Sequence, residues 1–237
     1  MIKRRMLLLA LIAALSLAAG AAADTPPAYQ LEGTVLEVTE DGSFLMENAQ
    51  WGNILVKTDA ATVWEGLKAA EAGAWVTLVY SGIMTKSVPP QVTAGLVICH
   101  RLEGTVLEAD EQEGTVLLDT FSMGRVLVRL PETQPFPAIG EALLVYTDGL
   151  MALSDPAQVK GRKVTALEIL QGTVSETGEG WFLLDSAEGP VRVNTGAASR
   201  MPEDLAPGDK VAVYYSGVMS RSIPPQVFGI TAVRVGE

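Results

Sequence analysis

The chain contains three copies of one segment, repeated with an almost constant period. LEGTVLEV begins at Leu31, LEGTVLEA at Leu102 and LQGTVSET at Leu170, so the period is 71 and then 68 residues. A second marker, rich in Pro and Gln, recurs in the same order at 87–92, 154–159 and 222–227. Ordered markers at a fixed period indicate tandem structural units. The chain therefore consists of three related small domains, each marginally stable alone.

Each copy contains five short runs rich in β-branched residues, separated by Gly, Asp and Pro, which indicates strands. The first run carries a glycine (Gly33, Gly104 or Gly172), where a strand can bend or bulge. A less regular piece with helical or turn character follows the third run. This order predicts an all-β chain with minor helix, built as three tandem five-stranded OB-like small barrels. An SH3-like barrel or a small sandwich fits the same pattern.

The expected domain bounds follow from the markers. We predict a signal peptide over 1–23 and OB-like barrel repeats over 29–101, 102–168 and 169–237. No Gly/Ser or Pro spacer separates the copies, so the last strand of one repeat continues into the first strand of the next. Without flexible spacers the barrels cannot swing freely. We therefore expect a short, fairly rigid rod in which neighbouring barrels stabilise one another.

The first residues have the pattern of a secretory signal peptide. Lys3, Arg4 and Arg5 precede an apolar run that ends in the small residues before Asp24. Cleavage there predicts a protein that is secreted or held in the cell envelope, extracellular or periplasmic. The run is also long enough to act as an uncleaved anchor. We expect no later membrane span, and no cysteine lies near the cleavage point to carry a lipid.

The charge of the chain is strongly negative, −11 overall. Three of the 17 basic residues and none of the 28 acidic ones lie in 1–23, so the remainder has a net charge of −14. Such a chain should repel nucleic acid and anionic membranes. We therefore expect no nucleic acid partner, and an extracellular or envelope ligand such as a glycan, a peptide or a protein. Solubility alone is the simpler explanation of the charge.

The second marker belongs to a loop that is almost identical in the outer repeats, SGIMTKSVPPQV at 81–92 and SGVMSRSIPPQV at 216–227. In OB-type barrels the loop between the last two strands often borders the ligand face. The candidate recognition residues are Met84, Lys86, Pro89, Pro90, Gln91, Met219, Arg221, Pro224, Pro225 and Gln226. The structural alternative is that Pro shapes the entry to the last strand, Gln satisfies backbone groups and Met fills a barrel end.

Other candidates are weaker. Cys99 and His100 are adjacent, but neighbours on a strand point to opposite faces and cannot pair. The acidic hairpin turns lack the ligand spacing of a calcium loop, and the Trp and Tyr residues are typical of packing as much as of a stacking platform. No catalytic motif is present, so we expect a protein that is not an enzyme, with no cofactor and no metal.

The repeated elements resemble a known group of proteins. Each copy has a Tyr and Gly closing the fourth strand and a Pro-x-Gln loop before the fifth: YSG with PPQV, YTDG with PAQV, and YYSG with PPQV. This order is similar to small secreted OB-like domains of unknown function in bacteria, often found on lipoproteins. The resemblance implies a barrel and an envelope or extracellular location. It implies no catalytic residues.

Together these observations predict an exported, non-catalytic binding or scaffolding module of tandem barrels. Two alternatives stay open at this level. One is a purely structural cell-envelope protein that uses its Met residues at domain contacts. The other is a hydrolase with an unrecognised carboxylate site, which would need two close carboxylates in a cleft.

Overall fold

The computed structural model describes residues 29–132, 135–196 and 199–236. Every regular element in these ranges is a strand, so the fold is all-β and the expected minor helix does not form there. The irregular pieces are turns instead, and one contains a three-residue strand. The described residues include no helix long and apolar enough to cross a membrane. The predicted signal peptide lies outside the described residues.

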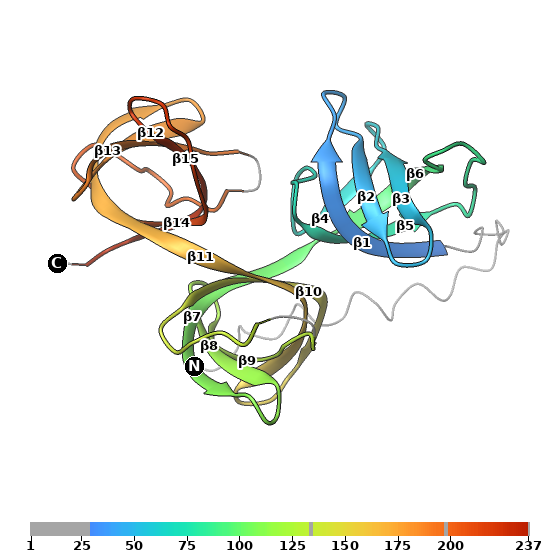
Figure 1. The fold of residues 1–237 in the computed structure, drawn as a ribbon, viewed down its shortest axis with the longest axis horizontal. Helices are drawn as coiled ribbons and strands as arrows, with labels where there is room; N and C mark the ends of the chain where they lie inside the picture. The colour runs from blue at the N-terminus through green and yellow to red at the C-terminus, as the bar shows by residue number, and fades with distance from the viewer. Residues whose placement is uncertain (1–28, 133–134, 197–198, 237) are drawn as a thin grey trace, which may run out of the picture.

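The strands form three successive groups (Figure 1). Barrel 1 consists of β1 (Tyr29–Val38), β2 (Phe44–Asn48), β3 (Gly52–Lys57), β4 (Val63–Glu65), β5 (Trp75–Tyr80) and β6 (Gln91–Ile98). Barrel 2 consists of β7 (His100–Asp110), β8 (Thr115–Thr120), β9 (Gly124–Arg129), β10 (Ala142–Ala152) and the first half of β11 (Ala157–Gly178). Barrel 3 consists of the second half of β11 with β12 (Trp181–Ser186), β13 (Gly189–Asn194), β14 (Lys210–Met219) and β15 (Gln226–Arg234).

All three groups close in the same way. In barrel 1, β1 pairs antiparallel with both β2 and β5, and β6 pairs antiparallel with β5. The barrel closes through a parallel contact between β3 and β6. The equivalent parallel contacts are β9–β11 in barrel 2 and β13–β15 in barrel 3. This five-stranded order confirms the predicted OB-like barrels.

The glycine of each first strand lies where the second strand comes closest. A Cβ atom on Gly33 would stand 2.1 Å from the carbonyl oxygen of Glu47, and one on Gly172 would stand 2.4 Å from that of Asp185. The register shift of the first strand comes slightly later, between Val35 and Glu37 in β1. The predicted bend is therefore present, but the glycine serves close backbone approach and the bulge follows it.

The fourth strand of barrels 2 and 3 is buried on both faces. In β10, Leu143 and Val145 belong to the core of barrel 2, whereas Leu144 and Tyr146 join a cluster with the core residues of barrel 1. The corresponding strand of barrel 3, β14, sends Tyr214 into that same cluster. A strand covered on both sides reads as a continuous apolar run rather than an alternating one. The runs ALLVY and VAVYY have this character.

The barrels do not form the expected rod. Figure 1 shows them at three corners around a common centre, with β11 running from barrel 2 into barrel 3. The shared apolar cluster includes residues from all three barrels. Adjacent barrels follow one another without a spacer, since β11 is continuous from barrel 2 into barrel 3. The expected end-to-end arrangement of the barrels was wrong. The fourth strands of barrels 2 and 3 are buried on both faces, and this brings the barrels together side by side. We call this shared contact region the junction.

Candidate functional site

A chain of four charged side chains crosses the junction. Arg101 on β7 has a fully buried side chain, and its Nε lies 2.8 Å from Oε1 of Glu103 on the same strand. Its Nη1 lies 3.2 Å from Oε2 of Glu71, in the turn before β5 of barrel 1. Arg200 of barrel 3 donates to the other oxygen of Glu103. The four residues therefore connect all three barrels.

Every charge in this chain has an opposite partner. Two arginines balance two carboxylates, and the Glu103 side chain is only 3% exposed. Burial raises the pKa of Glu71, and the charge of Arg101 opposes that rise. Because each carboxylate is paired with a guanidinium, the pair does not have the acid and base of a hydrolase. Among the described residues, no group of three His, Cys, Asp or Glu side chains is arranged to hold a metal ion.

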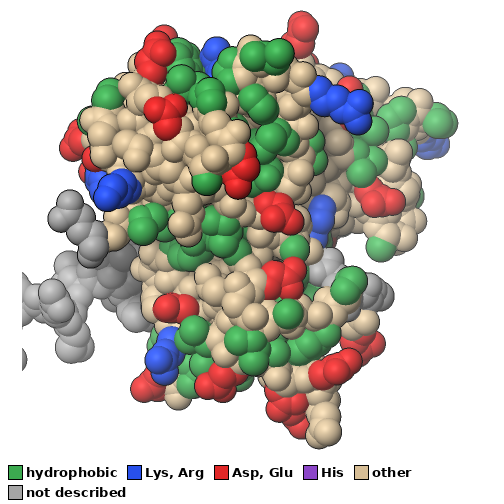
Figure 2. Space-filling model, turned by 60° about the vertical axis from the view of Figure 1, so that its left-hand side comes forward, with side chains coloured by type: hydrophobic (Ala, Val, Ile, Leu, Met, Phe, Trp, Pro, Cys, Tyr) green, Lys and Arg blue, Asp and Glu red, His purple; other side chains and the backbone are tan. Residues whose placement is uncertain are grey.

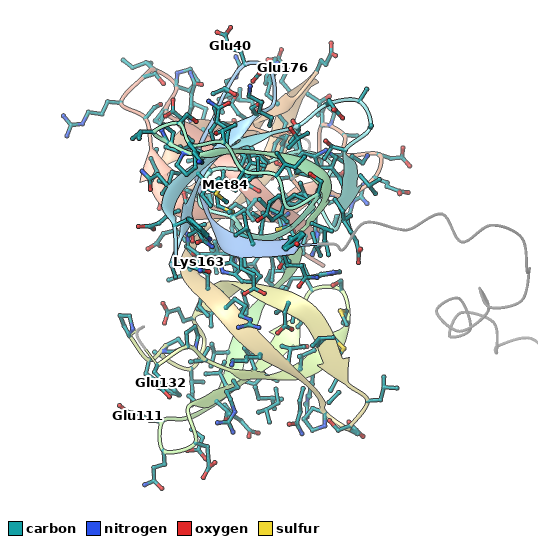
Figure 3. The ribbon with its side chains drawn as sticks, turned by 90° about the vertical axis from the view of Figure 1, so that its right-hand side faces the viewer. Glu40, Met84, Glu111, Glu132, Lys163 and Glu176 are labelled. Atoms are coloured by element: carbon teal, nitrogen blue, oxygen red, sulfur yellow. The ribbon has the colours of Figure 1, made fainter. Side chains whose placement is uncertain are left out.

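Further contacts surround the charged chain. Lys163 on β11 donates through Nζ to the carbonyl oxygen of Gly73 in barrel 1, and burial lowers the pKa of this lysine. Figure 3 shows Lys163 between barrel 2 and the barrels above it. The rings of Phe121 and Tyr214 join barrels 2 and 3, with centroids 4.5 Å apart. A junction cleft of about 470 Å³ opens beside Lys163.

The repeated loop is fixed by its own hydroxyl groups. In barrel 1, Thr85 Oγ1 lies 2.7 Å from Ser87 Oγ and accepts a 2.8 Å hydrogen bond from the backbone N–H of Gln91. Ser87 donates to the carbonyl oxygen of Pro89. In barrel 3 the same bonds are made by Ser220, Ser222, Pro224 and Gln226. The Thr/Ser exchange between the repeats therefore keeps a hydroxyl that closes the loop.

The middle repeat keeps only part of this arrangement. Ser154 donates to the carbonyl oxygen of Pro156, as the equivalent serines do in the outer barrels. Ala152 stands where the others have Thr85 and Ser220, so the second bond has no hydroxyl. Ala152 pairs with Gln158 across the β10–β11 hairpin, and the backbone N–H groups of Thr85 and Ser220 bond to Gln91 and Gln226 in the same way. All three loops are therefore closed by backbone pairing, and only the outer two add a hydroxyl bond.

The glycine that begins each loop has a packing role. Gly82 and Gly149 have φ values of 86° and 78°, a region that favours glycine. A Cβ atom on Gly82 would stand 2.3 Å from the ring of Tyr29, and one on Gly149 would stand 2.4 Å from the ring of His100. The side chain at the start of each barrel's first strand therefore packs on this glycine.

The predicted recognition residues divide into two groups. Met84 packs against the core of barrel 1, the four loop prolines are half-buried, and Gln91 and Gln226 begin the last strands. Lys86 and Arg221 are exposed, and Met219 is 38% exposed. Whether these residues recognise a ligand stays a prediction.

The loop tips present aliphatic side chains that the sequence analysis did not select. Val88 is 98% exposed, Ile223 is 100% exposed, and Leu153 of the middle repeat is 89% exposed. Exposed apolar side chains mark contact surfaces where they gather into a patch. Sequence alone gives little signal here, because an aliphatic residue in a proline-containing loop is equally compatible with burial.

Cys99 and His100 are separated as predicted. Cys99 is buried in the core of barrel 1, and burial raises the pKa of its thiol to about 12. Such a thiol is unreactive at neutral pH. His100 Nε2 lies 3.1 Å from Oε1 of Glu65, and its ring covers Gly149. The residues missed by sequence reasoning are the buried pair Arg101 and Glu103, which lie on one face of a strand two positions apart.

The acidic hairpin turns lie far from the junction. Figure 3 shows Glu40 and Glu176 at one end of the molecule and Glu111 at the other. Asp41 accepts hydrogen bonds from Thr39 and from Ser43 within its own turn, and these bonds lower its pKa. On the face in Figure 2, carboxylates are spread widely and few basic side chains are visible. These acidic turns are exposed to solvent.

Comparisons with known proteins are limited to the fold. No family model matches the chain, and no curated protein matches it. Two solved structures align with 10% identity. Drosophila Unr CSD456 covers 89% of this chain and 98% of its own, with a TM-score of 0.20. A multidomain protein with nucleic acid binding domains from Streptococcus pneumoniae TIGR4 covers 84% and 72%, with a TM-score of 0.21. At these scores the alignments carry no argument about function.

The expected exclusion of nucleic acid is nevertheless corrected. One of these matched structures is described as having nucleic acid binding domains, and the exclusion is withdrawn. The physical reason is that the exclusion used the net charge of the whole chain. Binding depends on the charge of one face, and a chain of net charge −11 can carry a locally basic surface. Nucleic acid is therefore a partner to be tested.

Proposed function

We propose that the chain is an exported, non-catalytic scaffold that presents its barrel loops to a protein partner. The observation that supports this proposal most is the exposure of Val88, Leu153 and Ile223 at the tips of closed loops. A loop that is already ordered loses little conformational entropy on binding. Core residues of the three barrels share the junction, so the loops belong to one packed unit.

The chemistry of the outer tips suggests the kind of partner surface. Val88 and Ile223 lie two residues from the exposed cations Lys86 and Arg221. An apolar pocket bordered by carboxylates would match both features, because it covers the aliphatic group and pairs the cation at the rim. The middle tip has Leu153 without a cation, so it is expected to contribute apolar contact alone.

A selection from a random peptide library on the immobilised intact chain tests this proposal. We expect enriched peptides to contain an apolar residue next to Asp or Glu. Their binding should fall at least tenfold in a variant carrying Val88→Ser, Ile223→Ser, Lys86→Ala and Arg221→Ala. A matched variant with Lys57→Ala and Arg125→Ala removes two exposed cations elsewhere and should bind normally. Peptides that bind both variants equally would contradict the proposal.

The structural alternative has its own support. Met84 packs against the core of barrel 1 and Met151 against the core of barrel 2, which agrees with a filling role. Under this alternative, Met84→Ala lowers stability while Lys86→Ala and Arg221→Ala change nothing measurable. The peptide selection would then give no enriched sequence.

A further inference from the structure

Barrel 3 carries on its outer surface a row of five side chains, of which only Gln226 has an identical counterpart in the other two barrels, Gln91 and Gln158. Strands β12 and β13 pair so that Trp181 is opposite Asn194 and Leu183 is opposite Arg192. Strand β15 then pairs parallel with β13, which places Gln226 beside Arg192 and Phe228 beside Asn194. The intervening residues are buried in the barrel core. We call Trp181, Arg192, Asn194, Gln226 and Phe228 the Arg192 strip.

The guanidinium group of Arg192 is held in place from two sides. Its Cζ atom lies 4.3 Å from the centre of the Trp181 ring, a stacked arrangement that orients the planar group. Its Nε donates a 3.1 Å hydrogen bond to Oδ1 of Asn194, and Nδ2 of Asn194 donates a 3.0 Å bond to Oε1 of Gln226. None of the ion pairs within the described residues involves Arg192.

The repeats show that the barrel does not need these residues to fold. The position of Arg192 is Leu55 in barrel 1 and Leu127 in barrel 2. Trp181 corresponds to Ser43 and Thr115, and Phe228 corresponds to Thr93 and Lys160. Three substitutions on one surface, with an ordered arginine among them, distinguish barrel 3 from closely related folds that lack the arrangement.

The Arg192 strip leads into the junction cleft. Phe228, whose side chain is 43% exposed, lines the cleft of about 470 Å³ as well as ending the strip. Barrel 2 contributes Tyr146 and Lys163 to the same cleft, and barrel 1 contributes Glu71. The cleft therefore offers donors and acceptors of hydrogen bonds next to an aromatic ring, and it exists only because the barrels meet.

We propose that the Arg192 strip and the junction cleft bind a glycan that carries a carboxylate, such as a uronic acid. The fork of an arginine matches a planar carboxylate, and stacking on Trp181 orders the fork in advance. The exposed ring of Phe228 offers an apolar surface to the C–H face of a sugar. The polar groups of the cleft suit sugar hydroxyl groups.

Other carboxylate or phosphate ligands fit the arrangement less well. The strip contains a single arginine, whereas a nucleic acid strand presents a row of phosphates that favours several cations. An acidic peptide would pair with the arginine but leaves the ring of Phe228 and the cleft without a matching group. The combination of one ordered cation, one ring and a polar cleft therefore favours a sugar acid.

Calorimetric titration of the intact chain tests the proposal with two matched disaccharides. One is a glucuronic-acid-containing disaccharide, and the other is its neutral glucose counterpart. We expect the uronate to bind at least tenfold more tightly than the neutral sugar. The NMR signal of the Trp181 indole N–H should shift with the uronate, since Trp181 lies against Arg192.

The variants are chosen from the repeats themselves. Arg192→Leu introduces the residue that barrels 1 and 2 already carry, so the fold should be kept, and it should abolish the preference for the uronate. Arg125→Leu removes an exposed arginine from the equivalent strand of barrel 2 and should leave the preference unchanged. The proposal is overturned if the uronate shows no preference, or if the preference survives Arg192→Leu.

Two further probes test whether an acidic peptide or a nucleic acid strand binds the same site. If hexaglutamate or an oligo-dT strand binds through Arg192 as tightly as the uronate, the glycan assignment is wrong. The loop variant that tests the scaffold proposal should leave uronate binding unchanged, because the loop tips and the strip are different sites. The two proposals can therefore fail separately.

Discussion

Arg101 is the buried cation between two carboxylates at the junction. Its side chain has no exposure, and it is the second residue of β7, which begins at His100. A buried charge whose partner is removed is strongly destabilised, since neither water nor an opposite charge compensates it. The junction therefore depends on both arginines and both glutamates being present.

Replacing Arg101 by leucine should lower the free energy of unfolding by about 3–5 kcal/mol, because Glu71 and Glu103 lose their shared partner. Urea denaturation followed by tryptophan fluorescence measures the change. Arg234→Leu is the control, since Arg234 pairs with Asp209 at the surface and its loss should lower stability much less. Equal effects of the two variants would show that the buried ion pairs of Arg101 contribute no more to stability than a surface ion pair does.

The raised pKa of Glu71 predicts a pH dependence of stability. Burial makes the folded protein hold this proton more tightly than the unfolded chain does. Its contribution is therefore fully present below the unfolded pKa near 4.5, and it is lost as the pH rises through the folded value. The free energy of unfolding of the wild type should therefore fall relative to that of Glu71→Gln as the pH rises from 4. Unfolding curves at several pH values measure this, and a flat difference would contradict the assignment.

At the scale of elements, the loop of the outer repeats has a hydroxyl that adds to its backbone closure and that barrel 2 lacks. Ser220 accepts from the backbone of Gln226 and contacts Ser222, so Ser220→Ala removes two interactions from an exposed turn. We expect a loss of about 0.5–1.5 kcal/mol, which is typical for hydrogen bonds of this kind. Thr85→Val in barrel 1 should behave alike.

Arg221→Ala, one residue away, is the matched control for this loop. Its side chain is exposed and makes no bond that closes the turn, so its effect on thermal stability should lie within about 0.5 kcal/mol. If Arg221→Ala destabilises as much as Ser220→Ala, the order of the loop does not come from the hydroxyl groups.

The strands and their order in each barrel could be predicted from the sequence, but the contacts between barrels could not. Period-two alternation and turn residues place the strands, and the repeat fixes the barrel. The runs around Leu144 and Tyr214 contain a signal for two-sided burial, but a short apolar run does not reveal which surface covers it. The pairing of Glu71 with Arg101 joins residues 30 apart through a turn, and no local pattern predicts it.

The same limit applies to the candidate sites. The loop was identified because it is repeated, whereas the Arg192 strip is found in one barrel only. Trp181 was recognised in the sequence as one aromatic residue among several. Its place in the Arg192 strip depends on the register between β12 and β13, which brings Arg192 and Asn194 beside it.

At the scale of the whole molecule, the shared junction predicts cooperative unfolding. The core of barrel 1 continues into Leu144 of barrel 2 and Ile230 of barrel 3, so no barrel can unfold without exposing the apolar surface of the others. Calorimetry should therefore show one transition whose van't Hoff and calorimetric enthalpies agree. Three resolved transitions would mean that the barrels are independent.

Small-angle X-ray scattering of the chain after the predicted leader tests the central claim most directly. Three barrels of this size packed around one junction should have a radius of gyration of about 20 Å, whereas the same barrels in a row should have one of about 25 Å. A value near 20 Å, with a scattering profile that matches the arrangement in Figure 1, is the predicted result. A value near 25 Å, unchanged in Arg101→Leu, would contradict the junction and the fixed arrangement of loops that depends on it.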